Sequence, residues 1–233
     1  AAGWYRKAAE QGLAGAQYNL GLLTATGQGV TRDYAAAATW FRKAAGQGIA
    51  PARYSLGFQY VSGLGVKQDY AAAARLYRQA AEQGDARAQS GLAFLYVKGL
   101  GVNRDYAEAA RWYRAAADQG DAGAQFNIGF LYATGRGMQQ DYTAAAGWFR
   151  KAAEQGFTQA QHNLGVLYAN GRGVKRDEMQ AYKWFTIATA RGHKKAVKNR
   201  DLVGARLTPA RRAEAERLAR EWDGKFGSRG RNP

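Results

Sequence analysis

Apolar residues recur at helical spacing in a unit that the chain repeats. In its first half, Ala16, Leu20 and Leu23 stand at positions i, i+4 and i+7, which places them on one face of a helix. The second half continues with apolar residues at Ala37, Trp40, Phe41, Ala44 and Ala45. This spacing predicts a second amphipathic helix, so the unit is expected to be a helical hairpin.

Turn-forming residues mark the ends of both expected helices. Gly27 follows the first helix, where a left-handed C-cap would end it. Gly29 allows a tight turn of the backbone in the loop, and the side chain of Val30 can pack into the core. Asp33 is well placed to cap the N-terminus of the second helix, and Gly48 closes that helix.

The unit returns every 36 residues, a period typical of a stacked array rather than of a globular domain. The period is visible at Gly12, Gly48, Gly84, Gly120, Gly156 and Gly192, and at Asp33, Asp69, Asp105, Asp141 and Asp177. We therefore expect an all-α protein. It would consist of a leading half repeat (1–12), repeats 13–48, 49–84, 85–120, 121–156 and 157–192, capping helices over 193–223 and a basic flexible tail over 224–233.

Two aromatic columns in the second helices are expected to supply the large core side chains. They are Trp4, Trp40, Leu76, Trp112, Trp148 and Trp184, and next to them Tyr5, Phe41, Tyr77, Tyr113, Phe149 and Phe185. Alanine columns beside them let helices approach closely. Because one hairpin cannot bury both its faces, stability must come from stacking neighbours.

Composition adds a strong positive charge. The 233 residues carry a net charge of +16, and residues 192–233 alone hold twelve Lys or Arg against five Asp or Glu. This balance favours acidic partners, although dispersed charge can also serve solubility.

The chain has no Cys, no run long enough to span a membrane and no signal segment. Because it opens abruptly inside a helix pattern, we expect a mature or trimmed N-terminus.

The combined pattern A-x-x-x-L-G-x-x-Y-x-x-G-x-G-V-x-x-D-Y resembles the Sel1-like repeat family, relatives of the tetratricopeptide repeats. Residues 163–174 are a near-consensus copy, whereas Thr24 stands in the Tyr column and Ala93 in the Gly column. The resemblance covers residues 1–192. It implies a right-handed α-solenoid whose first helices line the concave side, a role in binding other proteins and no habit of catalysis. Some bacterial members act as immunity proteins against secreted phospholipase effectors, and others as envelope or signalling adaptors.

The first helices have a second apolar arc, which is the candidate partner-binding surface. At 100° per residue, positions 18, 22 and 25 lie roughly 180–240° away from Ala16. Over five repeats this arc and its basic neighbour contain Tyr18, Leu22, Tyr54, Phe58, Ser90, Phe94, Lys98, Phe126, Phe130, His162 and Val166, with Arg53 and Arg87 as accessory basic residues. Aligned by the resemblance, these are concave-face positions. The alternative is that they pack between repeats.

A second column, on the second helices, is basic: Arg6, Arg42, Arg78, Arg114 and Arg150, with Lys7, Lys43 and Lys151 beside it. It could be a stripe that binds phosphates or acidic protein. The favoured alternative is a solvated outer face whose Arg side chains pair with nearby Asp or Glu.

The residues of the chain do not indicate a catalytic site or a cofactor site. His162 and His193 are the only imidazoles, they belong to different units, and no second ligand recurs at metal spacing. The GxG pairs lack a third glycine and a preceding strand, so they are interpreted as loop caps. The Asp column is better explained by helix capping than by acid–base chemistry.

The sequence thus predicts a non-enzymatic scaffold without cofactor that captures another protein, one with an acidic surface, on its concave face. The most concrete version is a bacterial immunity protein that covers a secreted phospholipase-type toxin, as type VI secretion would require. The expected location is the periplasm, and the cytoplasm is the alternative. Alternatives are an envelope assembly or signalling adaptor and a nucleic-acid-binding repeat protein. The absence of a continuous basic–aromatic patch argues against the last.

Overall fold

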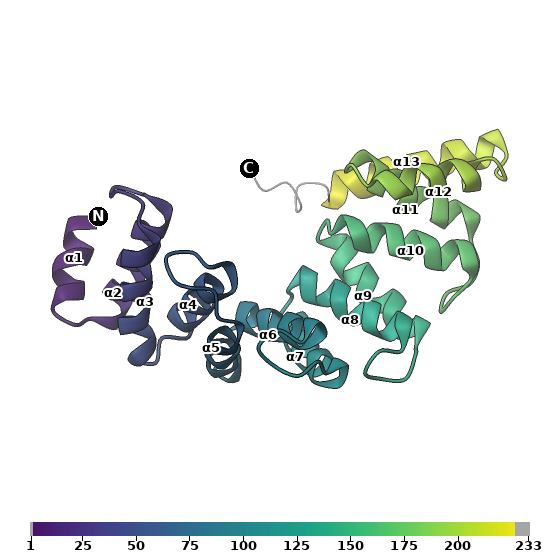
Figure 1. Cartoon of the computed structure of the whole chain (residues 1–233). Coiled ribbons are helices and arrows are strands. Elements are labelled where there is room, and N and C mark those ends of the chain that lie inside the picture. The colour runs from purple at the N-terminus through teal and green to yellow at the C-terminus, as the bar shows by residue number, and fades with distance from the viewer. Residues whose placement is uncertain (1, 227–233) are drawn as a thin grey trace. The chain divides into compact units, whose positions relative to one another are not determined.

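The structure, a computed structural model, describes residues 2–226 and forms thirteen α-helices without a strand over that range (Figure 1). The chain divides into two compact units, residues 1–116 and 117–233. In both, consecutive helices pack as hairpins and the hairpins stack on one another. The all-α solenoid expected from the sequence is confirmed.

The first unit contains α1 (Ala2–Glu10), α2 (Ala14–Thr26), α3 (Tyr34–Gly46), α4 (Ala50–Ser62), α5 (Tyr70–Glu82), α6 (Ala86–Lys98) and most of α7 (Tyr106–Asp118). The second contains α8 (Ala122–Thr134), α9 (Tyr142–Glu154), α10 (Thr158–Asn170), α11 (Glu178–Ala190), α12 (Lys194–Gly204) and α13 (Pro209–Phe226). The even-numbered helices α2 to α10 begin the hairpins, and we call them the A-helices. Their partners α3 to α11 are the B-helices.

The caps that the sequence predicts are present. Asp33 accepts hydrogen bonds from the backbone N–H groups of Ala35 and Ala36, at 2.9 and 3.0 Å, and so satisfies two donors at the start of α3. Asp69, Asp105, Asp141 and Asp177 cap their B-helices in the same way. Gly27 ends α2 in the left-handed region, at φ 75°.

The second glycine of three GxG loops has a role beyond the turn. Gly65, Gly101 and Gly173 adopt φ of 65–69°. A Cβ on any of them would lie 2.1–2.2 Å from a backbone carbonyl carbon at the start of the preceding B-helix. The loop of one repeat therefore rests directly on the backbone of the repeat before it. Gly29 has a similar φ but nothing within 4 Å of its hypothetical Cβ.

A ladder of amide side chains also joins successive hairpins. Gln17 donates through Nε2 to the carbonyl of Ala9, eight residues earlier, at 3.2 Å. The same bond recurs from Gln89, Gln125 and Gln161 to the last turn of the B-helix before them. These glutamines are buried, so the bond satisfies both a side-chain N–H group and a helix-end carbonyl.

The expectation that every Trp in the first aromatic column is a core residue is wrong at the N-terminal end. Trp112, Trp148 and Trp184 are buried, but Trp4 is 78% exposed and Trp40 is half-buried. Within the described residues α1 packs on α2 and no helix covers its other face, so the indole of Trp4 remains in solvent. The ring column behind it, from Phe41 onward, is buried as expected.

The predicted start of the tail is three residues too early. Helix α13 begins at Pro209 with Thr208 as its cap, as expected, but it continues to Phe226. The ring of Phe226 lies 5.3 Å from that of Trp222, and this packing favours the extra helical residues. The remainder of the predicted tail, residues 227–233, lies outside the described residues.

Candidate functional site

The predicted arc divides into two rows that differ in their contacts. The first row, at position 18 and its equivalents, is half-buried against the B-helix of the same hairpin. Tyr18 lies 6.0 Å from the ring of Phe41, and Tyr54 stacks on Tyr77 at 5.6 Å. Phe126 packs on three rings of the second unit, the nearest being Phe157 at 5.1 Å. Each ring of this row therefore supports the core and presents only part of its surface.

The second row, at position 22 and its equivalents, projects into solvent on α2, α4, α6 and α8. In the first unit Leu22 is 37% exposed, Phe58 48% and Phe94 43%; in the second, Phe130 is 39% exposed. Large apolar side chains are usually buried. Their repeated exposure at one position of the A-helices therefore indicates an apolar surface that recurs with the repeat. We call this row the A-face ladder.

The ladder borders an apolar hollow in the first unit. The hollow has a volume of about 270 Å³ and lies between α2 and α4. Leu22, Tyr54 and Phe58 line it together with Phe41 at its base. Because apolar side chains line most of it, the hollow can take an apolar side chain of a partner.

Basic side chains flank the apolar row. The guanidinium of Arg87 lies 4.7 Å from the ring of Tyr54, and its Nη2 forms an ion pair of 2.9 Å with Asp85. This hydrogen bond raises the pKa of Arg87, and the guanidinium is half exposed. The ammonium of Lys98 lies 5.9 Å from the ring of Phe94. The ladder of the first unit is therefore an apolar row with cations at its edge.

Arg53, expected as an accessory basic residue, also has a structural contact. Its Nε donates to the carbonyl of Ala45 at 3.2 Å. This is the bond that glutamine makes at the equivalent position of other repeats, as Gln17 does with Ala9. The sequence shows the signal, because position 53 stands 36 residues after Gln17 in a column otherwise filled by Gln.

His162 lies in the predicted row, but its ring is engaged with the cap of the second unit. It stacks on His193 at 4.3 Å, and its Nε2 lies 3.0 Å from Nδ2 of Asn199. Its Nδ1 lies 3.2 Å from Oδ1 of Asn163. Burial lowers the pKa of His162, and the nearby His193 lowers it further. A neutral ring with Nδ1–H satisfies both bonds.

The remaining predicted residues, Ser90 and Val166, are half-buried. Ser90 offers only a small side chain, and Val166 packs on the core cluster around Phe185. The structure adds one residue that the sequence reasoning missed. Leu202 on α12 is 55% exposed and stands 36 residues after Val166, so the same period could have identified it as a member of the ladder.

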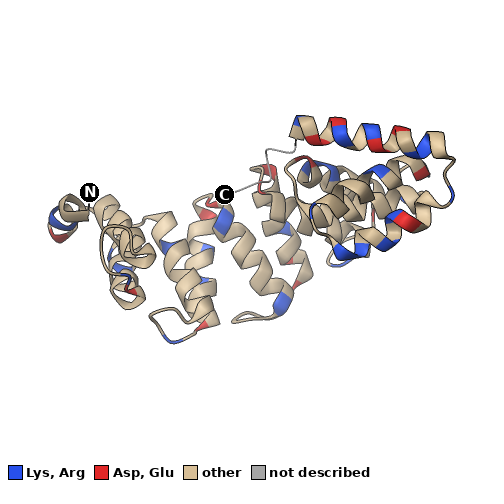
Figure 2. Ribbon diagram, turned by 90° about the horizontal axis from the view of Figure 1, so that it is seen from above, with Lys and Arg blue, Asp and Glu red and all other residues tan. Residues whose placement is uncertain are grey.

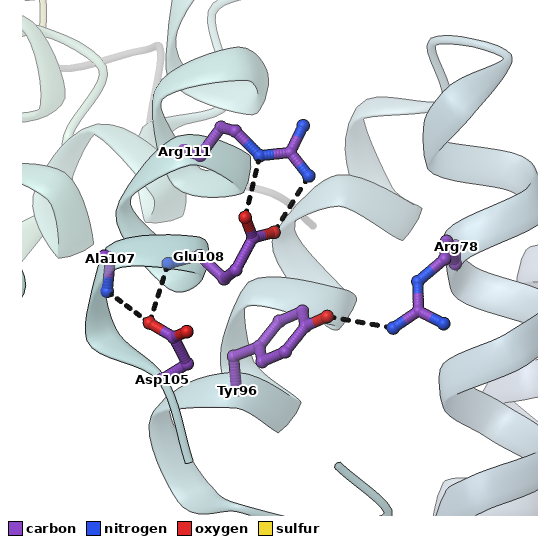
Figure 3. Close-up of polar contacts among 6 residues, drawn as sticks. All are labelled: Arg78, Tyr96, Asp105, Ala107, Glu108 and Arg111. Carbon is purple, nitrogen blue, oxygen red and sulfur yellow. Dashed lines mark hydrogen bonds and ion pairs between the residues drawn. The ribbon is translucent and has the colours of Figure 1, made fainter. Parts of the chain in front are cut away.

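Two residues of the basic column of the B-helices bind neighbouring tyrosines, which neither expectation anticipated. Figure 3 shows Arg78 donating to the hydroxyl of Tyr96 on the next A-helix, at 2.8 Å. Arg150 donates to Tyr168 in the same way, at 2.9 Å. The Lys residues beside this column lie over the Trp rings of their own helices, as Lys151 does over Trp148 at 4.2 Å. These cations therefore contribute to repeat packing.

Charge is otherwise spread over many helices. Figure 2 shows Lys and Arg on most of them, and α13 alternates basic and acidic residues. No group of three His, Asp or Glu side chains that could hold a metal ion is found within residues 2–226. None of the helices in that range is long and apolar enough to cross a bilayer.

The Sel1 repeat model matches the chain six times in succession, over residues 1–13, 14–49, 50–85, 86–121, 122–157 and 158–193. A Sel1 repeat protein from Oxalobacter formigenes is 33% identical, with a TM-score of 0.77, over 90% of this chain and 86% of its own. The antigen c5321 of uropathogenic Escherichia coli, which has an SLR fold, is 33% identical with a TM-score of 0.66. It covers 97% of this chain, which spans only 56% of that antigen.

A third solved structure, the immunity protein Pa5087 from Pseudomonas aeruginosa, is 22% identical over 81% of this chain and 72% of its own, with a TM-score of 0.50. At this identity the likeness is one of fold. No curated protein matches the chain. Sel1 repeat scaffolds are suited to protein–protein interaction and are generally non-catalytic. Six consecutive matches, supported by two relatives at 33% identity, show that the chain belongs to the Sel1 repeat family.

Proposed function

We propose that the chain is an interaction scaffold that binds an acidic protein through the A-face ladder of its first unit. The observation that carries this proposal is the exposure of Leu22, Phe58 and Phe94, one per repeat, at 37%, 48% and 43%. Packing within each hairpin explains the row of Tyr18 and Tyr54 but leaves these three side chains in solvent. Exposed apolar side chains in register are the usual anchors of a protein interface.

Charge supports an acidic partner. Arg87 and Lys98 lie beside the ladder rings, and the net charge of the chain is +16. Like-signed charges at the rim of an apolar surface speed the encounter with an oppositely charged protein and disfavour basic ones. Aromatic burial would then supply most of the affinity and the cations would supply orientation.

A photo-crosslinking experiment tests the proposal in living cells. A photoreactive phenylalanine analogue replaces Phe94 in one variant and the exposed Arg75 of α5, on the B-helix surface, in a second. We expect a discrete crosslinked protein from the position of Phe94 and none from that of Arg75. Crosslinking only from position 75 would contradict the proposal.

Once the partner is identified, its affinity for variants of the chain can be measured. Phe58→Ser and Phe94→Ser are each expected to weaken binding by about 2 kcal/mol, roughly thirtyfold, as anchors at the centre of an interface do. Arg87→Glu should slow association and weaken its salt dependence, whereas Arg75→Glu, the same charge change on a B-helix, should change binding little. Unchanged affinity in both serine variants would remove the ladder as the binding surface.

The most specific form of the proposal is a bacterial immunity protein that covers a secreted phospholipase-type toxin in the periplasm. The shared fold of Pa5087 is consistent with this form. Co-expression with a toxin encoded beside it should restore growth to cells that the toxin kills, and Phe94→Ser should abolish this protection. If no neighbouring toxin exists and the crosslinked protein belongs to the envelope, an assembly or signalling adaptor is the better description.

A further inference from the structure

A second candidate site lies in the second unit, apart from the A-face ladder, and Tyr168 of α10 is the one residue of an A-helix among its lining residues. The site is a hollow of about 670 Å³ between α9, the loop that leads into α11, α11 itself and α13. Arg150, Lys175 and Lys183 contribute cations to its lining, and Trp184, Trp222 and Phe226 contribute apolar surface. This volume is in the range of sites that bind small organic molecules.

These three cations of the hollow lack carboxylate partners within the described residues. Lys183 is half-buried and forms no ion pair within residues 2–226; its ammonium lies 5.0 Å from the ring of Trp184. Burial lowers the pKa of Lys183, and the charge of Arg150 lowers it further. Arg150 donates to the neutral hydroxyl of Tyr168, and Lys175 is exposed. Positive charge is therefore in excess here, because these three cations and Arg176 line the hollow with only two carboxylates, Glu154 and Asp177.

Two acidic groups near the hollow already have other contacts. Asp177 uses its carboxylate to cap α11, accepting from Met179 and Gln180. Glu221, whose charge favours protonated Lys183, is ion-paired with Arg217. Of the carboxylates that line the hollow, only Glu154 has no such contact in the described residues. An anionic ligand would thus meet a net excess of positive charge.

The sequence of this repeat removes a partner that another repeat keeps. Arg111, two periods before Lys183, pairs with Glu108 three residues earlier, at 2.8 Å (Figure 3). The residue three before Lys183 is Gln180, so the equivalent ion pair cannot form. Lys183 therefore has no carboxylate three residues earlier with which to pair.

We propose that this hollow binds a small organic phosphate, with the phosphate between Arg150 and Lys183 and an aromatic or other apolar body against Trp222 and Phe226. Two cations match the charge of a phosphate monoester, and guanidinium can hold two of its oxygens at once. The rings of Trp222 and Phe226, which lie 5.3 Å apart, provide the apolar wall. The site is independent of the A-face ladder.

Phenyl phosphate is the probe, and the indole N–H signals of Trp184 and Trp222 in the full chain report on it by NMR. Titration should shift these two signals saturably. Lys183→Gln should weaken binding about tenfold, since one charge-assisted contact is lost. Lys151→Gln, on the exposed face of the same helix as Arg150, should leave the affinity unchanged. Phenol, which has no charge, should produce no saturable shift.

Two further measurements separate binding from a structural role. Lys183→Gln should leave the urea midpoint equal or higher, because it removes an uncompensated, partly buried cation. Inorganic phosphate should bind more weakly than phenyl phosphate, since it lacks the apolar body. The proposal is overturned if phenyl phosphate leaves both indole signals unmoved, if Lys183→Gln binds as tightly as the parent, or if phenol binds equally well.

Discussion

Gly101→Ala and Gly29→Ala are the same substitution at equivalent positions of the repeat, yet we expect very different effects on the first unit. Both glycines adopt a left-handed backbone, with φ of 66° and 72°. A Cβ at position 101 would lie 2.2 Å from the carbonyl carbon of Tyr70 and 2.4 Å from the backbone nitrogen of Ala71. At position 29 it would meet nothing within 4 Å.

The expected magnitudes follow from these two environments. A left-handed backbone conformation destabilises the folded state by about 1–2 kcal/mol when glycine is replaced by alanine. The same change stabilises the fold by about 0.4–1 kcal/mol, because alanine lowers the conformational entropy of the unfolded chain. Gly29→Ala should therefore lower the free energy of unfolding by about 1 kcal/mol. Gly101→Ala incurs this cost too, and its Cβ must also push two backbone segments apart by more than 1 Å, as judged from the 3.4 Å of ordinary contact. Overpacking of this kind adds about 2–4 kcal/mol.

Urea unfolding followed by far-UV circular dichroism measures the difference. We expect Gly101→Ala to lower the free energy of unfolding by about 3–5 kcal/mol and Gly29→Ala by about 1 kcal/mol. Hydrogen exchange at the start of α5 should quicken only in Gly101→Ala, because the loop that rests on it would lift away. Equal losses in the two variants would refute the reasoning, since the backbone strain is shared and only the contact with the preceding repeat differs.

Three further outcomes are expected. Asp105→Ala should lower the free energy of unfolding by about 1 kcal/mol through loss of the α7 cap, and Asp105→Asn, which can still cap, should lose less; equal losses would contradict capping. Tyr96→Phe should cost about 1 kcal/mol in urea unfolding by removing the acceptor of Arg78, and Arg78→Gln should cost nothing more in that background. Because its pKa is lowered in the fold, His162 binds a proton more readily in the unfolded chain, so its contribution is complete above the unfolded pKa and is lost as pH falls through the folded value. The urea midpoint of the second unit should therefore fall on acidification from near neutral pH, and His162→Gln should fall less; parallel pH profiles would exclude this role.

Local chemistry determined the hairpin and its period. The Asp column, the first glycine of each loop and the apolar spacing act within one or two turns of helix, so their consequences are visible in the sequence itself. Asp33 and Gly27 take the roles expected of them. The exposed ladder was included in the predicted arc, because a helix with two apolar arcs can be recognised by spacing alone. Which of its side chains bind a partner stays a prediction.

Contacts between repeats were decided only in the tertiary structure. Gly65 and Gly101 look like turn residues, yet their missing Cβ makes room for the backbone of another repeat, about 30 residues away in sequence. Arg78 and Arg53 look like free surface cations, yet each bonds to a neighbouring helix. A one-dimensional pattern states which residue types recur, but it does not state which atom meets which across the stack. That depends on helix separation and side-chain reach, which exist only once the repeats have packed together.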